Sequence, residues 1–134
     1  MQERLSSWIS PSPGAEARPQ LILMLVEGTA DAAFAVNTGG RISAWNQAAA
    51  ELFGRSESQA IGVRCHELFQ CSDENTSTCH EYCIIERAAQ DNRPLSNFDL
   101  RLQTKTGKLW CNLSTLIATD HRSGTRHEIG RAHV

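Results

Sequence analysis

Apolar residues along this chain occur in short runs, each bounded by turn residues. The apolar run 21–26 has helical length and ends near Gly28, whereas the run 33–36 is as short as a strand. Residues 37–40, Asn-Thr-Gly-Gly, supply the positive φ angles that a hairpin needs, and residues 41–45 alternate as a second strand. The first part of the chain therefore predicts a helix followed by a β-hairpin.

Two sets of capping residues follow this hairpin. Asn46 is a good N-cap for a helix over residues 48–53, which Gly54 would close. Ser56 and Gln59 form a capping-box pattern for a second short helix, which ends at Gly62. We expect these helices to lie across one face of a sheet.

The second half of the chain predicts one helix and three strands. The helix runs from Cys79 to about Gln90, because residues 91–94, Asp-Asn-Arg-Pro, break it. Residues 98–103 and 109–118 alternate as strands around a turn, and a last strand has room from Thr125 onward. Two strands, several short helices and three more strands predict an α+β fold with an antiparallel sheet.

The segment from about Leu21 to Ala118 resembles a PAS domain. The residues that carry the resemblance are 34–37 (FAVN), 40–42 (GRI), 45–49 (WNQAA), 52–54 (LFG), 61–62 (IG), 98–100 (FDL), 105–107 (KTG), Trp110, Asn112 and Ser114. The resemblance implies a five-stranded antiparallel sheet with short helices on one face, which cradle a small cavity. It also implies a sensory or dimerising module rather than an enzyme. The sequence shows no recognisable set of a nucleophile, a general base and a group that orients the base.

With 134 residues, the chain has room for one domain. We predict an N-terminal extension and linker over residues 1–18 and a PAS domain over residues 19–126. Residues 127–134 are predicted to be a truncation or a non-native tail, because residues 128–134 back-translate to a sequence that resembles a common sequencing adapter. We therefore expect the natural protein to continue past about Arg126 into an output domain.

The charge and hydropathy of the chain exclude two classes of partner. The net charge is -2 with the basic residues dispersed, so we expect no direct nucleic-acid binding. The apolar run 21–26 is far shorter than the roughly 20 residues that span a bilayer, and the first ten residues lack the pattern of a signal peptide. The sequence thus predicts a cytoplasmic location without membrane contact, where cysteines are normally reduced.

Four of the five cysteines fall in one segment, at Cys65, Cys71, Cys79 and Cys83. Thiolates are ligands for zinc and iron–sulfur clusters, so these residues are the candidate metal ligands, and a thiol redox sensor is an alternative. No Cys-x-x-Cys spacing of a zinc ribbon or a ferredoxin is present, and cysteines also pack as small apolar residues. Metal or cluster binding, redox sensing and simple packing all stay open.

The cysteine segment also resembles a subgroup of bacterial PAS domains with a Cys-rich insert. Cys65, Cys79 and Cys83 match its pattern, whereas Cys71 is an addition. Members often precede a LuxR-type helix-turn-helix or a histidine kinase. This resemblance implies a homodimeric sensor of redox state, ligand or metal, in a transcription regulator whose output domain is missing here. The alternative is a ligand-free structural or dimerisation PAS domain of a sensor histidine kinase.

Overall fold

The structure, a computed structural model, describes residues 20–70, 84–120, 122 and 124–134. The described helices are α2 (Gln20–Glu27), α3 (Gln47–Phe53), α4 (Glu57–Ala60), α5 (Cys65–Phe69) and α6 (Ile84–Gln90). The strands are β1 (Ala32–Val36), β2 (Ile42–Trp45), β3 (Phe98–Thr104), β4 (Gly107–Asp120) and β5 (Thr125–His133). The predicted start of the last helix at Cys79 lies outside the described residues, and α6 occupies the end of the predicted range.

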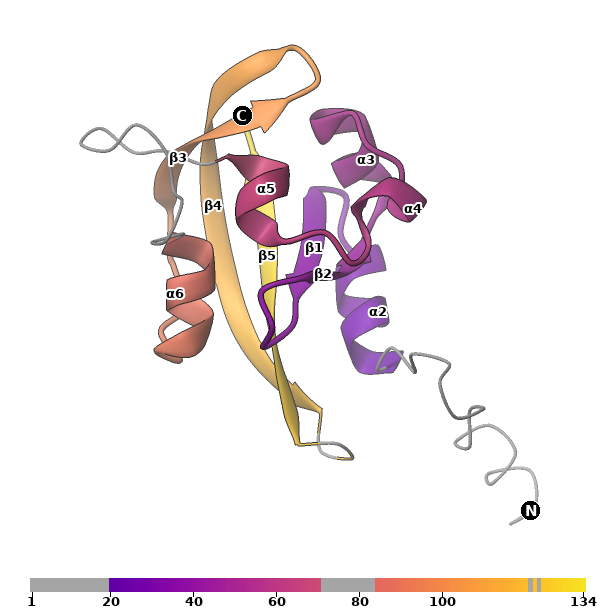
Figure 1. Ribbon diagram of the computed structural model, residues 1–134, viewed down its shortest axis with the longest axis vertical. Coiled ribbons are helices and arrows are strands. Elements are labelled where there is room, and N and C mark those ends of the chain that lie inside the picture. The colour runs from indigo at the N-terminus through magenta and orange to yellow at the C-terminus, as the bar shows by residue number, and fades with distance from the viewer. Residues whose placement is uncertain (1–19, 71–83, 121, 123) are drawn as a thin grey trace.

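The five strands form one antiparallel sheet in the order β2-β1-β5-β4-β3, as Figure 1 shows. This confirms the predicted fold class. The hairpin β1–β2 and the hairpin β3–β4 do not pair with each other. The last strand, β5, lies between them and pairs with both β1 and β4.

The short-range capping predictions are confirmed. The side chain of Asn46 accepts a hydrogen bond from the Ala49 N–H at the start of α3, and Gly54 ends that helix with a φ of 73°. Ser56 and Gln59 form both bonds of a capping box at α4. Each interaction joins residues only a few positions apart, so the sequence alone specifies it.

The β1–β2 turn is built around Asn37 and Gly40. The Asn37 Oδ1 accepts hydrogen bonds from the N–H groups of Gly39 and Arg41. Gly40 has a φ of 78°, which favours glycine because a Cβ is strained there. The carbonyl of Gly40 accepts a hydrogen bond from the Cys65 N–H at 2.8 Å, so the turn also holds the start of α5.

The face of the sheet toward α3, α4, α5 and α6 carries the larger core cluster. Four aromatic side chains fill its centre: Phe34, Trp45, Phe53 and Phe69. The ring centroids of Phe34 and Phe69 are 4.7 Å apart, and those of Phe53 and Phe69 are 4.9 Å apart. These rings occupy the middle of the helix-covered face and confine open space to its edges.

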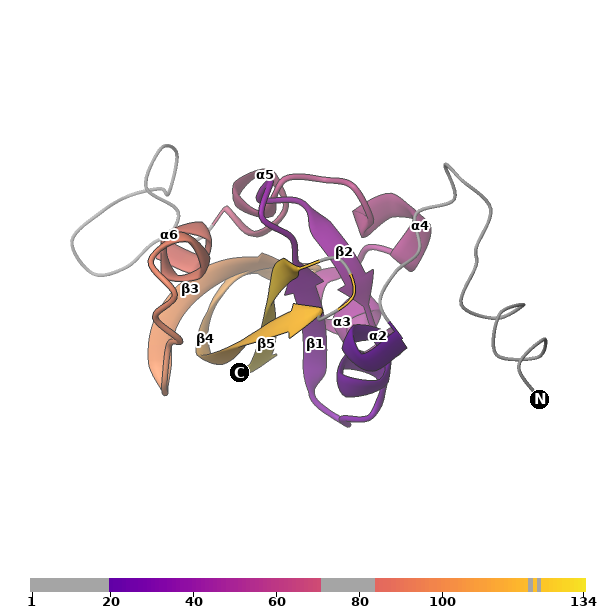
Figure 2. The ribbon, with the colours of Figure 1, turned by 90° about the horizontal axis from the view of Figure 1, so that it is seen from below.

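The opposite face of the sheet is covered by α2. Ile22 and Val26 pack against the alternate residues of the N-terminal strands, including Ala33 and Ala44. Figure 2 shows α5 and α6 above β4 and β5, and α2 lower, beside β1. The helices α3 and α4 lie on one face, as expected, whereas α2 can approach the other face closely because the strand residues beneath it are mostly alanines.

Residues 127–133 belong to β5, which confirms the predicted last strand. Gly130 allows β5 to pack tightly, because a Cβ at this position would lie 2.5 Å from the Phe34 ring. The origin of residues 127–134 stays a prediction. Within the part of the chain that the structure describes, no helix is long and apolar enough to cross a membrane.

Candidate functional site

The predicted cysteine site falls largely outside the described residues. Cys71, Cys79 and Cys83 are not among the described residues, and only Cys65 is. Cys65 is the first residue of α5, is fully buried and belongs to the core cluster under the helices. The four-thiolate prediction therefore stays a prediction.

The described residues contain a second cysteine, Cys111, on the inner face of β4. It is 1% exposed, and burial raises the pKa of its thiol. A raised pKa disfavours the thiolate that metal binding and redox chemistry require. Across residues 20–70, 84–120, 122 and 124–134, no group of three or more His, Cys, Asp and Glu side chains is arranged to hold a metal ion.

A small cavity lies at one edge of the helix-covered face, between α6, the β1–β2 turn and the strands β4 and β5. Its volume is about 70 Å³. The residues that line it are Asn37, Thr38, Gly40, Glu86, Gln90, Ile117, Arg126, His127 and Glu128. Most of these side chains are polar, so the cavity favours a hydrogen-bonding occupant over an apolar one.

The cavity is small in comparison with most ligand sites. Drug-sized ligands occupy pockets of roughly 300–1,000 Å³, whereas a water molecule takes up about 30 Å³. The 70 Å³ seen here fits a few heavy atoms or about two water molecules. A larger cofactor would need the surrounding helices to move.

Glu86 connects the cavity wall to two other elements. Both of its carboxylate oxygens lie 3.5 Å from Nη2 of Arg64, and Oε1 lies 3.7 Å from Nδ1 of His66. A Cβ at Gly40 would lie 2.7 Å from Cδ of Glu86, so the carboxylate packs directly against the β1–β2 turn. The side chain of His66 is 26% exposed and faces this carboxylate.

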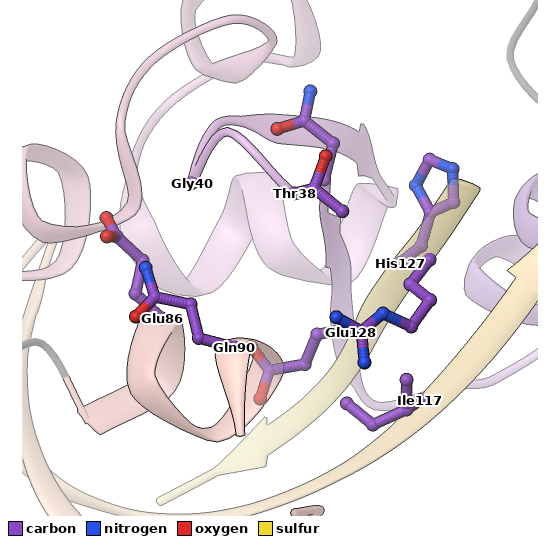
Figure 3. Close-up of a pocket in the computed structure, with 9 residues that line it drawn as sticks. Thr38, Gly40, Glu86, Gln90, Ile117, His127 and Glu128 are labelled. Atoms are coloured by element: carbon purple, nitrogen blue, oxygen red, sulfur yellow. The ribbon is translucent and has the colours of Figure 1, made fainter. Parts of the chain in front are cut away.

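The strand wall of the cavity comes from the end of the chain. Figure 3 shows Glu128 extending from β5 toward α6, while the imidazole ring of His127 is directed away from Glu128. Glu128 is fully buried, and its strand partners are Val36 and Ile117.

Only a local pattern in α6 indicates this site before the structure is known. Glu86 and Gln90 are four residues apart in α6 and share one face, whereas Ile85 and Ala88 are buried. That amphipathic pattern could have marked α6 as a helix with a polar inner edge. Nothing local marks Arg64 as the partner of Glu86, because the two residues are 22 positions apart.

Comparisons with known proteins agree with this geometry at the level of the fold. A family model described as the PAS fold matches residues 22–134. No curated protein sequence matches the chain.

Several solved structures are similar to the chain. In the Escherichia coli DhaR(N)–DhaL complex the TM-score is 0.62 at 15% identity, and the match covers 99% of this chain but 39% of the matched chain. The light-state dimer of the fungal blue-light photoreceptor Vivid has a TM-score of 0.61 at 16% identity, and the match covers 100% of this chain and 93% of the matched chain. A PAS domain from a two-component sensor histidine kinase has a TM-score of 0.59 at 16% identity, and the match covers 85% of this chain and 93% of the matched chain. At these identities the likeness shows the fold alone.

Proposed function

Because this chain belongs to the PAS fold family, we propose that it is the sensory module of a bacterial signalling protein and has no enzymatic activity of its own. Its signal is a ligand, a metal or the redox state of the cysteine segment. The observation that carries this proposal is the polar cavity beside α6. In the sequence, α6 directly follows residues 71–83, which include three of the four candidate ligands, Cys71, Cys79 and Cys83.

The proposed mechanism is a shift of α6 between two positions against the sheet. A signal moves such an equilibrium only by the difference in its affinity for the two states. Glu86 and Gln90 belong to α6 and line the cavity, so a change at either the cavity or the cysteine segment would move the same helix. The sheet strands β4 and β5, which form the opposite wall, would pass the shift onward.

The receiver of this shift is proposed to be an output domain in the natural continuation of the chain past about Arg126. We favour a transcription regulator with a helix-turn-helix and place a histidine kinase second. In support of the latter, one of the similar structures is a PAS domain from a two-component sensor histidine kinase. The domains found in the natural continuation of the chain would decide between them.

The test uses protein purified without air. We expect bound metal, visible absorbance, or a change in amide hydrogen exchange at α6 when the thiols are oxidised or when small polar ligands are added. Substitution of Cys71, Cys79 and Cys83 by serine should abolish a cysteine-based response, whereas Cys111→Ala, which removes the thiol on β4, should keep it. Metal-free, colourless protein whose α6 exchange responds to no oxidant and to no ligand would overturn the sensory proposal.

A second candidate function is dimerisation, which a specific surface favours. Leu21, Met24 and Leu25 of α2 are 55%, 68% and 40% exposed and share one face of the helix. Leu116 of β4 is 47% exposed and pairs with Ile129, which packs under α2. The occupant that we propose for this surface is a second copy of the chain, and the similar photoreceptor Vivid was solved as a light-state dimer.

A further inference from the structure

The helix α6 is held in place by two kinds of contact. Its described part, Ile84–Gln90, depends on tertiary contacts, because short helices are marginal in water without them. Ile85 and Ala88 are buried on its core side. A polar attachment is made by the Glu86 carboxylate, which contacts Arg64, His66 and Gly40.

The three partners of Glu86 belong to segments that are joined to each other. Arg64 precedes α5, and His66 lies within it. The β1–β2 turn contacts the same region through the backbone. The Gly40 carbonyl accepts a hydrogen bond from the Cys65 N–H, and Arg41 and Arg64 form an isolated antiparallel β-bridge between their main chains. One carboxylate thus attaches α6 to a unit made of the turn and the start of α5.

The geometry of this attachment is loose. The Arg64 distances of 3.5 Å lie beyond the usual range for a charge-assisted hydrogen bond. The side chain of Arg64 is 38% exposed, so solvent screens the pair. The buried Nε of Arg64 has no hydrogen-bond acceptor among the described residues, whereas Nη2 of the same guanidinium lies 3.5 Å from Oε1 of Glu86.

We propose that Glu86 is an electrostatic latch: its contacts with Arg64 and His66 hold α6 over the cavity, and loss of these contacts releases the helix and widens the cavity. The regulatory meaning of the latch rests on the proposed function, since it assigns the cavity a role in sensing. The latch itself is a property of α6 and can be tested without any ligand.

The experiment is amide hydrogen exchange on the full chain, read at residues 88–90 of α6 and compared with α3. Glu86→Gln keeps the size of the side chain and removes its charge, and Arg64→Met removes the partner while Glu86 stays near the helix N-terminus. We expect exchange at α6 to become about fivefold faster in both variants, with α3 unchanged. The matched control is Asp91→Asn, which removes the exposed Arg87–Asp91 pair from the end of the same helix and should leave exchange unchanged.

A second measurement tests the latch without any substitution, in case a variant fails to fold. In the unmodified protein, high salt should speed exchange at α6 more than at α3, because screening weakens a partly exposed ion pair. Equal exchange at α6 in Glu86→Gln and Asp91→Asn, or no preferential effect of salt, would overturn the latch. A working latch together with a cavity that answers to no ligand or oxidant would instead contradict only the proposed function.

Discussion

Asn46 is the residue through which three elements of the fold are joined. Its Oδ1 accepts hydrogen bonds from the N–H groups of Ala33 in β1 and Ala49 in α3. Its Nδ2 donates to the carbonyls of Val26 in α2 and Asp31 before β1. The side chain is buried, so each of these backbone groups depends on Asn46 rather than on water.

We predict that Asn46→Ala lowers the free energy of unfolding by about 3 kcal/mol, because it removes a helix cap and leaves buried backbone groups unsatisfied. Urea denaturation followed by circular dichroism measures the change. The control is Asn112→Ala, whose amide donates to Asp99 on the exposed side of the sheet and should shift stability by at most about 0.5 kcal/mol. Equal effects of the two substitutions would contradict the role of Asn46.

At the scale of the element, β5 carries a buried carboxylate. Glu128 is fully buried on the helix-covered face, beside Val36 and Ile117 in the neighbouring strands. Removing a carboxylate from water costs free energy, and interactions inside the protein must offset that cost. Glu128 makes such an interaction, so its loss should be felt in stability.

Glu128→Val should lower the free energy of unfolding by about 1–3 kcal/mol, since valine keeps the side-chain volume but loses the interaction that the carboxylate makes inside the protein. Arg131→Val, at an exposed position of the same strand, is the control and should change stability by about 0.5 kcal/mol or less. A stabilised Glu128→Val protein would contradict this expectation and would agree with the prediction that residues 127–134 are non-native. Destabilisation would instead show that the fold uses this carboxylate.

Elements were predictable where their determinants are local. Asn46, Gly54, Ser56 and Gln59 act on residues within a few positions, so helix ends could be placed from the sequence. The position of α2 could not, because Ile22 and Val26 are apolar whichever face of the sheet they cover. Its choice of face depends on alanines in strands that follow it in the chain.

At the scale of the whole molecule, the exposed apolar face of α2 predicts self-association. Met24→Glu should shift the protein from dimer to monomer, because a charge in the centre of an apolar interface is left without water. Light scattering coupled to size-exclusion chromatography measures the mass over a range of concentrations. Ser58→Glu, which places the same charge on α4 away from the patch, should leave the mass unchanged; an unmodified protein that is monomeric throughout would exclude this dimer.

The arrangement of the candidate site depends on contacts that only the complete fold creates. The pairing of Glu86 with Arg64, and the approach of both to Gly40, join segments far apart in the sequence. The family resemblance supplied the sheet and the expectation of a small cavity, but not which side chains line it. Of the four clustered cysteines, only Cys65 is among the described residues, and it is buried. Metal binding and redox sensing by this cluster are therefore predictions from the sequence.

The central place of β5 has a consequence for how the protein is made. Ala32 of β1 pairs with Ala132 of β5, so this contact forms between residues that leave the ribosome at very different times. The hairpins β1–β2 and β3–β4 can each close early during translation, but they have no strand between them until residues 125–133 emerge. Until then both hairpins present open edges, and the nascent chain is exposed to mispairing with its neighbours.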